Sequence, residues 1–347
     1  MTWPALLGAL TRGDEVSLDD IRWAMREVMA GAATPAQMSA FVVALRMRGE
    51  QPEQIAALVE VMLEFSERID PHGVAVDTCG TGGDGAHTVN ISTMAAVLLA
   101  ASGVPIVKHG NRAASSKCGS ADVLEALGVK IDGDPASAQR AFDEIGLTFC
   151  FAPVFHPALR FAGPTRRELG IPTVFNLLGP LANPASPQAQ LMGVADLSKA
   201  PLMLDALRIR GTSALVVRGH DGLDELSIFA PSTIWATWLD APVTVTPAEL
   251  GVDAHPTDAL AGGDAAFNAS VARRLLDGEQ TSDLRAVADA VVLNAACAAV
   301  AVDAARGTAA TDLLGAIAQH AVNLRAVLAS GAAGQLLDRW IAVTNRS

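Results

Sequence analysis

The stretch DTCGTGGDGAHTVNIST, residues 77–93, and after a short apolar run the stretch VPIVKHGNRAASSKCGS, residues 104–120, decide the fold that the sequence predicts. They contain two loops that are rich in small residues and hydrogen-bond donors. Each loop follows a short run of β-type residues, 74–77 and 104–107. Two strands leading into two loops would place both loops at one edge of a sheet.

The first loop, GTGGDG at residues 80–85, has too many glycines for a regular element and too many polar atoms for a core. Glycine allows positive φ and lets main-chain N–H groups approach an anion. The following NIST, residues 90–93, precedes an apolar run that predicts a helix, which Asn90 or Ser92 would cap. These features favour a phosphate site. A glycine-rich turn with an ordinary helix cap is an equally good interpretation of this loop alone.

The second loop, KHGNR at residues 108–112, combines two cations, an imidazole and an amide, and serines follow it closely. Arginine and lysine pair with phosphate oxygens, and serine hydroxyls can complete such a cradle. For His109 we favour a structural, hydrogen-bonding role over one as acid or base. The two loops together indicate an anion site.

The composition limits the class of protein and of ligand. A chain of 347 residues, half of them hydrophobic, is long enough for about two domains with a substantial core. The net charge of −12 argues against a general affinity for nucleic acid. Because basic residues nevertheless gather at 108–117, we expect a local site for a small anionic ligand.

Cysteine spacing and the apolar segments predict a cytoplasmic protein without a membrane partner. The four cysteines form no C-x-x-C pair, so neither a zinc site nor a redox motif is indicated, and reduced thiols are expected. Residues 1–17 do not resemble a signal peptide. The apolar segment 286–305 is interrupted by Asp289, Asn294 and Asp303, so we expect no segment long enough to span a bilayer.

The order of predicted elements indicates an α/β fold with a small all-α domain at the N-terminus. Helices are predicted at residues 3–10, 17–30, 34–48 and 52–66, with capping boxes starting at Ser17 and Thr34. From residue 74 onward strands and helices alternate, which implies a mostly parallel central sheet covered by helices. We therefore predict a helical domain, 1–70, completed by helices near 165–185, and an α/β domain, 71–347.

Three further motifs have both a functional and an ordinary interpretation. Two adjacent arginines in RRELG, Arg166 and Arg167, are more often solvated than bound to a ligand. Asp224 and Glu225 follow a predicted strand in a glycine-bearing turn, and their oxygens suit Mg²⁺ if the phosphate loops lie nearby. The second Gly-Gly-Asp, which ends at Asp264, lacks a basic partner loop, so we predict that Asp264 caps a helix.

Four motifs together resemble the anthranilate phosphoribosyltransferase family, a class related to pyrimidine nucleoside phosphorylases. They are GTGGDG with NIST, KHGNR with the following serines, RRELG, and NLLGPLANP at residues 176–184, and the similarity covers nearly the whole chain. The resemblance implies transfer of a phosphoribosyl group from 5-phosphoribosyl 1-diphosphate (PRPP) to the amine of anthranilate, in tryptophan biosynthesis. It also implies Mg²⁺ as cofactor and a homodimer formed through the helical segment.

The family motifs, matched residue by residue, imply three sets of site residues. Those expected to bind PRPP are Gly80, Gly83, Asp84, Thr88, Asn90, Ile91, Ser92, Thr93, Lys108, His109, Gly110, Asn111, Arg112, Ala113, Ala114, Ser115, Ser116 and Ser120. Anthranilate would contact Gly80, Asn111 and Arg166, and Mg²⁺ would be held by Ser92, Asp224 and Glu225. No general acid or base is assigned, because an aryl amine is already a nucleophile in its neutral form.

Two alternatives stay open at the level of sequence. A pyrimidine nucleoside phosphorylase would need a nucleobase pocket and would bind free phosphate, and KHGNR and RRELG argue against it because the related phosphorylases carry a different basic loop. A catalytically inactive paralogue could instead bind nucleic acid or a partner protein. The acidic net charge and the full set of motif residues argue against that alternative.

Overall fold

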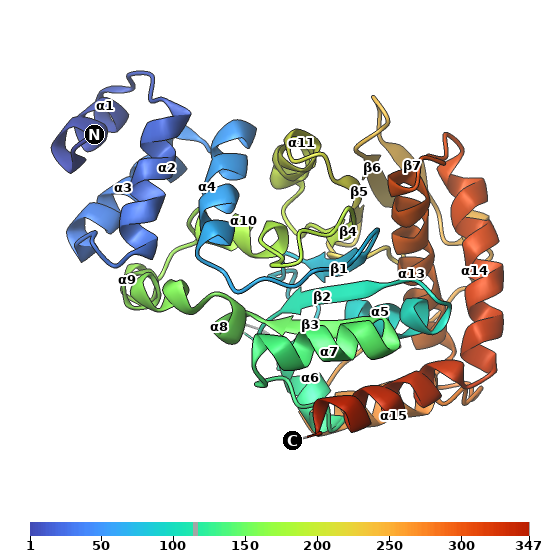
Figure 1. Ribbon diagram of the computed structural model, residues 1–347. Coiled ribbons are helices and arrows are strands. Elements are labelled where there is room, and N and C mark those ends of the chain that lie inside the picture. Colours follow the sequence, from blue (N-terminus) through green and yellow to red (C-terminus); the bar gives the residue numbers. More distant parts are fainter. Residues whose placement is uncertain (114–116, 347) are drawn as a thin grey trace.

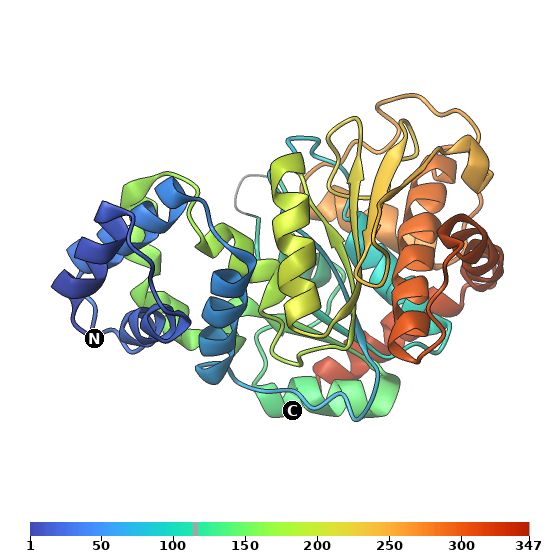
Figure 2. The same cartoon turned by 90° about the horizontal axis from the view of Figure 1, so that it is seen from above.

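The N-terminal helices form the small lobe seen on the left of Figures 1 and 2. The computed structural model describes residues 1–113 and 117–346. The four helices are α1 (Trp3–Arg12), α2 (Leu18–Met29), α3 (Pro35–Arg48) and α4 (Pro52–Glu64). The Ser17 hydroxyl accepts a hydrogen bond from the N–H of Asp20, and Thr34 and Gln37 form a reciprocal capping box. Both predicted helix starts are therefore confirmed.

The described residues of the larger part form a seven-stranded sheet in the order β3-β2-β1-β4-β5-β6-β7. The strands are β1 (Val76–Gly80), β2 (Ile106–Gly110), β3 (Leu147–Phe151), β4 (Ala189–Gly193), β5 (Ser213–Gly219), β6 (Ser232–Ala236) and β7 (Val243–Val245). The strands β1 to β5 pair in parallel, and β6 and β7 are antiparallel additions at one edge. The predicted α/β class with a mostly parallel sheet is confirmed.

The remaining helices cover the sheet or connect it to the helical lobe. They are α5 (Ile91–Ala101), α6 (Ser120–Ala126), α7 (Pro135–Ile145), α8 (Ala152–Phe155), η1 (Pro157–Phe161), α9 (Gly163–Leu169), α10 (Phe175–Leu178), η2 (Gly179–Leu181), η3 (Leu197–Lys199), α11 (Ala200–Ile209), η4 (Ala248–Leu250), α12 (Ala265–Leu276), α13 (Arg285–Ala305), α14 (Leu313–Ala329) and α15 (Ala332–Thr344). In Figure 1, α9 and α10 lie beside α1 to α4, far along the chain from them.

Alternate residues of the central strands enter two different cores. On β5, Leu215 and Val217 pack with α5, α13 and α14, whereas Ala214 and Val216 pack with α11 and the helical lobe. This alternation is the two-residue period of a strand that is buried on both faces. The core of the helical lobe is therefore continuous with one face of the sheet.

The helix α13 corrects one expectation from the sequence. Despite Asp289, Asn294 and Asp303, residues Arg285–Ala305 form one helix that is long and apolar enough to cross a membrane by length and composition. However, 89% of its apolar window is buried inside the protein. It packs against α5, α14 and the central strands, so α13 is a core helix of the α/β part.

The parallel register aligns the carboxyl ends of the central strands. Gly80 at the end of β1 is paired with Gly193 at the end of β4, and Gly110 at the end of β2 is paired with Phe151 of β3. The strands β1 and β2 start two residues later than predicted and extend into the GTGGDG and KHGNR motifs. Gly80 and residues 108–110 therefore lie on strands rather than in loops. The segments that follow β1, β2 and β5 emerge at the same edge of the sheet.

Candidate active site

The predicted site residues that the structure describes lie at the carboxyl edge of the sheet, apart from Arg166. Gly80 ends β1, Gly83 and Asp84 lie in the loop after it, Thr88 pairs with Ala261, Asn90 precedes α5, and Ile91, Ser92 and Thr93 form the first turn of α5. Lys108, His109 and Gly110 end β2, Asn111, Arg112 and Ala113 follow it, Ser120 starts α6, and Asp224 and Glu225 follow β5. Arg166 lies apart on α9. The residues Ala114, Ser115 and Ser116 lie outside the described residues.

Direct contacts join the glycine loop to the acidic turn. The N–H of Gly82 donates a hydrogen bond to Oδ2 of Asp224 over 2.7 Å. A Cβ atom on Gly80 would lie 2.2 Å from that same carboxylate oxygen, and one on Gly193 would lie 1.5 Å from the carbonyl oxygen of Asp224. Glycine at both strand ends is therefore what allows the acidic turn to pack against them.

We expect Gly80→Ala to lower kcat/KM by at least about tenfold, because the added methyl group must displace the Asp224 carboxylate from the glycine loop. Initial rates of the transfer reaction that the family resemblance implies, at a series of PRPP and Mg²⁺ concentrations, measure this effect. The matched control is Gly133→Ala, where the nearest atom to the added Cβ lies 3.4 Å away. Equal rates for the two variants would contradict the proposed packing.

Three carboxylates meet beside this turn. Asp84 lies within hydrogen-bonding reach of Asp224, and burial followed by the charge of Asp84 raises the pKa of Asp224 to about 7. Burial and then the Asp224 charge raise the pKa of Glu225 well above its usual value, with Lys108 and the main-chain N–H of Ser92 acting in the opposite direction. Crowded carboxylates of this kind are stabilised by a cation.

The donor set fits Mg²⁺ better than a metal that needs a complete protein cage. Among residues 1–113 and 117–346, no three His, Cys, Asp or Glu side chains are arranged to hold an ion by themselves. Two carboxylates and a hydroxyl leave positions for water and substrate phosphates, which is the arrangement that Mg²⁺ prefers. The Ser92 hydroxyl lies 3.2 Å from Nζ of Lys108, at the edge of this acidic cluster.

Lys108 is a buried cation inside the site rather than a solvated one. Its side chain is almost fully buried, and its Nζ donates to the carbonyl oxygen of Thr78 and to Ser92. Its charge acts on both Asp77 and Glu225, whose pKa values it lowers against the effect of burial. Lys108 therefore offsets part of the negative charge at this edge of the sheet.

Arg112 pairs with acidic side chains that the sequence motifs did not indicate. Its guanidinium pairs with Asp122 over 3.1 Å and with Glu125, both on α6, and stacks over Phe151 at 5.5 Å. Asp122 also accepts the main-chain N–H groups of Ala113 and Gly119. In this structure Arg112 holds the start of the second loop against α6.

His109 is neutral. Burial, and then the neighbouring His156, whose ring lies 5.1 Å away, lower the pKa of His109 to about 3. Its Nδ1 lies 3.2 Å from the carbonyl oxygen of Gly179, so this nitrogen carries the proton. These observations favour the structural role over one in proton transfer.

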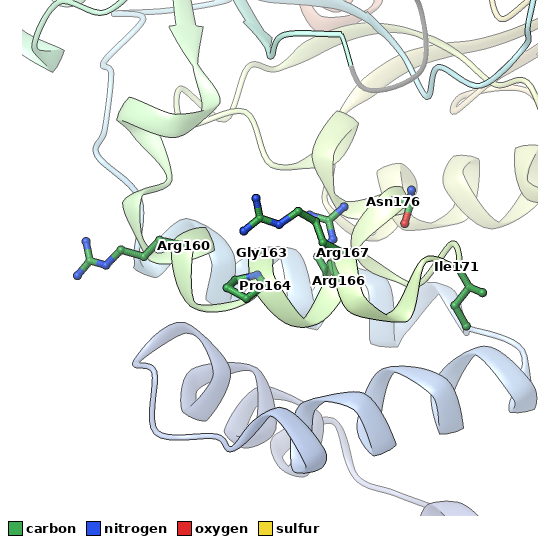
Figure 3. A pocket seen from close by; sticks show the side chains of 7 residues that line it. All are labelled: Arg160, Gly163, Pro164, Arg166, Arg167, Ile171 and Asn176. Carbon is green, nitrogen blue, oxygen red and sulfur yellow. The ribbon is translucent and has the colours of Figure 1, made fainter.

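Arg166 lines a cavity of about 550 Å³ beside α9. The cavity is lined by Arg160, Gly163, Pro164, Arg166, Arg167, Ile171 and Asn176. Figure 3 shows Arg166, Arg167 and Asn176 on the same side of α9, with Arg160 pointing the other way. Arg166 is half-buried over the ring of Phe175, burial lowers its pKa, and among the described residues it has no carboxylate partner. Such a guanidinium is suited to an anionic ligand.

The segment 260–264 forms hydrogen bonds with the residues that follow the first loop, and the sequence did not predict this contact. Thr88 bridges to Ala261, and the N–H of Gly262 donates to the carbonyl oxygen of His87 over 2.8 Å. Asp264 caps α12 by accepting the N–H of Phe267, as predicted. The Gly-Gly-Asp pattern indicated the cap, but no local signal indicates a contact with residues more than 170 positions earlier.

The whole chain is similar to proteins of one family. Two models of the glycosyl transferase family match it, the helical bundle domain at residues 4–66 and the a/b domain at residues 72–334. Anthranilate phosphoribosyltransferases from Saccharopolyspora erythraea and Rhodococcus opacus are 50% and 51% identical to it, covering 98% and 99% of this chain and 95% and 94% of theirs.

Solved structures give the same result. The anthranilate phosphoribosyltransferase from Thermus thermophilus has a TM-score of 0.88 and 41% identity, over 98% of this chain and 99% of its own. The Saccharomyces cerevisiae enzyme in complex with PRPP and Mg has a TM-score of 0.87 and 26% identity, over 99% and 97%. The chain therefore belongs to the anthranilate phosphoribosyltransferase family.

Proposed function

We propose that this chain transfers the phosphoribosyl group of PRPP to the amine of anthranilate and releases diphosphate, as a step of tryptophan biosynthesis. The observation that carries the proposal is the meeting of the glycine loop and the acidic turn at one sheet edge, joined by the hydrogen bond from Gly82 to Asp224. Next to them, buried Lys108 and the second loop supply positive charge. PRPP carries phosphate groups at two ends of a ribose, which suits this distribution.

The PRPP site in this proposal consists of the two loops and the first turn of α5. Main-chain N–H groups of the glycine loop would bind the diphosphate, because Gly82, Gly83 and Gly85 all have φ between +67° and +84° and present no side chain. In this proposal the residues that the family motifs assign to PRPP bind it directly, with the exception of Arg112. Because Arg112 is paired with Asp122 and Glu125, it holds the second loop against α6 and does not itself contact PRPP while those pairs last.

The residues Ser92, Asp224 and Glu225 would hold Mg²⁺, which when bound supplies charge stabilisation for the departing diphosphate. Transfer breaks the C1–O bond of PRPP, which leaves positive charge on the ribose and the bonding electrons on the diphosphate; the amine nitrogen then bonds to C1 and releases one proton to the diphosphate or to water. The N–H donors of the glycine loop stabilise the negative charge, and the protein positions the amine in line with C1. Anthranilate would bind with its carboxylate on Arg166 and its ring toward Gly80 and Asn111.

The remaining expectations are also proposals. We place a domain boundary near residue 70, supported by the separate helical-bundle and a/b matches at 4–66 and 72–334. A homodimer through the helical lobe is supported by the exposed apolar side chains of Met47, Phe161 and Ile171. A cytoplasmic location is supported by four free cysteines.

The proposed function is tested by following anthranilate fluorescence with purified protein. We expect consumption of anthranilate only when PRPP and Mg²⁺ are both present, with one diphosphate released per anthranilate consumed. The same protein incubated with pyrimidine nucleosides and phosphate should release no free base. Phosphorolysis without anthranilate consumption would identify a nucleoside phosphorylase instead, and salt-sensitive DNA binding without either reaction would indicate an inactive paralogue.

A further inference from the structure

Three hydrogen bonds in series connect α12 to both substrate loops. The N–H of Gly263 donates to Oδ1 of Asn268 over 2.8 Å, Nδ2 of Asn268 donates to Oδ1 of Asn90 over 2.9 Å, and Nδ2 of Asn90 donates to the carbonyl oxygen of Cys118 over 3.1 Å. Asn90 directly precedes α5, in the connection that begins with the first loop, and Cys118 lies just before α6, in the connection that begins with the second loop. The series therefore spans from the segment behind the first loop to the second loop.

Main-chain groups fix the direction of this series. Because the N–H of Gly263 can only donate, the Asn268 oxygen must face it, and the Asn268 amide nitrogen must face Asn90. Because the carbonyl of Cys118 can only accept, the Asn90 nitrogen must face it. Both amides thus have a single orientation that satisfies all their partners.

The sequence offered Asn90 or Ser92 as the side-chain cap of α5, and Asn90 does not serve as one. It stands at the start of α5, but its amide forms no hydrogen bond to the first turn of that helix. The amide instead reaches across to Cys118. One of the two side chains that the sequence offered as caps therefore connects the segment before α5 to the segment before α6.

The hydrogen bonds that satisfy the buried amide of Asn268 come from residues outside its own helix. Asn268 is about 2% exposed, in the first turns of α12, where asparagine has no propensity advantage. A buried amide is costly unless its donors and acceptors are satisfied. Both of its amide atoms bind groups outside α12, and its amide also reaches the Cys118 side chain.

We propose that Asn268 is a positioning residue for PRPP binding: it fixes the Asn90 amide and, through it, the separation of the two loops. The inference rests on the proposed function, in which one PRPP molecule contacts both loops. Asn268 has no contact with substrate in this role. Its effect is expressed in the affinity for the molecule that bridges the loops, and not in the affinity for anthranilate.

The test is Asn268→Asp, which keeps the size of the side chain and the acceptor for Gly263. The carboxylate oxygen that replaces Nδ2 of Asn268 then faces Oδ1 of Asn90, so two acceptors meet without a proton between them. Rotating the Asn90 amide would remove this repulsion but would place Oδ1 of Asn90 against the carbonyl oxygen of Cys118 instead. We expect the Kd for PRPP with Mg²⁺, measured by calorimetry, to rise about tenfold, as one buried mismatched hydrogen bond typically causes. KM for anthranilate at saturating PRPP should stay within about twofold of wild type, the range expected where no contact with anthranilate is lost.

The matched control is Asp312→Ala, which removes the side-chain N-cap of α14 and lies outside the segment 260–264 and both loops. This control should lower the melting temperature but leave the Kd for PRPP unchanged. If Asn268→Asp does not fold, Asn268→Ser provides the same measurement, because a hydroxyl cannot reach both partners. A wild-type Kd in a folded Asn268 variant, or an equal rise in Asp312→Ala, overturns the inference. If the wild-type protein does not bind PRPP at all, the proposed function fails instead.

Discussion

Replacing Asp224 and Glu225 together by alanine is expected to abolish the Mg²⁺ response of the reaction and to lower kcat/KM by at least about a hundredfold. Both side chains are enclosed beside the glycine loop, where burial and mutual repulsion raise their pKa values. Removing them takes away the negative charge that would attract a divalent cation. The diphosphate would then leave without that cation to balance its charge.

The measurement is the initial rate at fixed PRPP and anthranilate over a series of Mg²⁺ concentrations. The matched control is the double variant Asp132→Ala/Asp240→Ala, which removes two exposed carboxylates and changes the net charge by the same amount. It should behave like the wild type. A Mg²⁺ response in Asp224→Ala/Glu225→Ala that equals the wild-type response would exclude both residues as ligands.

The same double variant should not be less stable than the wild type when Mg²⁺ is absent. The two carboxylates repel each other and Asp84, so removing their charges relieves an unfavourable interaction in the folded state. Adding Mg²⁺ should raise the melting temperature of the wild type and not that of the variant. Thermal unfolding with and without Mg²⁺ therefore separates loss of the metal from loss of the fold.

Arg166→Ala is expected to raise KM for anthranilate by about tenfold to a hundredfold, because the variant cannot form the two charge-assisted hydrogen bonds to the anthranilate carboxylate. KM for PRPP should change little, because Arg166 lies on α9 and no described residue of the two loops forms a hydrogen bond or ion pair with it. Arg166→Lys should recover only part of the affinity, since a lysine cannot form the two-pronged pair.

Arg160→Ala is the matched control for Arg166→Ala. Arg160 borders the same cavity but points away from Arg166 and Asn176, over the ring of Phe161 (Figure 3). Its replacement should leave KM for anthranilate near the wild-type value. If KM for PRPP rises as much as KM for anthranilate in Arg166→Ala, the assignment of Arg166 to anthranilate is wrong.

The sequence was sufficient to predict features that depend on neighbouring residues. Strand-then-loop patterns before GTGGDG and KHGNR placed both motifs at one sheet edge, and the parallel pairing of β1 with β2 agrees with this. The capping signals at Ser17, Thr34 and Asp264 also act within three residues of the cap. Local hydrogen bonding decides such features, so they can be read from a short window.

Features that depend on tertiary packing could not be predicted. The motif showed that Arg112 is a cation but not that Asp122 and Glu125 of the following helix would pair with it. Likewise, Asn90 or Ser92 was predicted to cap α5, and only the folded chain brings Asn268 and Cys118 close enough to bind the Asn90 amide. In both cases the partner is chosen by how helices pack on the sheet, which no spacing in the sequence specifies.

The most direct test of the central claim is a crystal structure of this chain with PRPP and Mg²⁺. We expect one PRPP molecule in contact with both the glycine loop and the second loop. The metal ion should lie between the diphosphate and the carboxylates of Asp224 and Glu225. PRPP bound away from that edge of the sheet, or held by only one of the two loops with no metal at the acidic turn, would contradict the account.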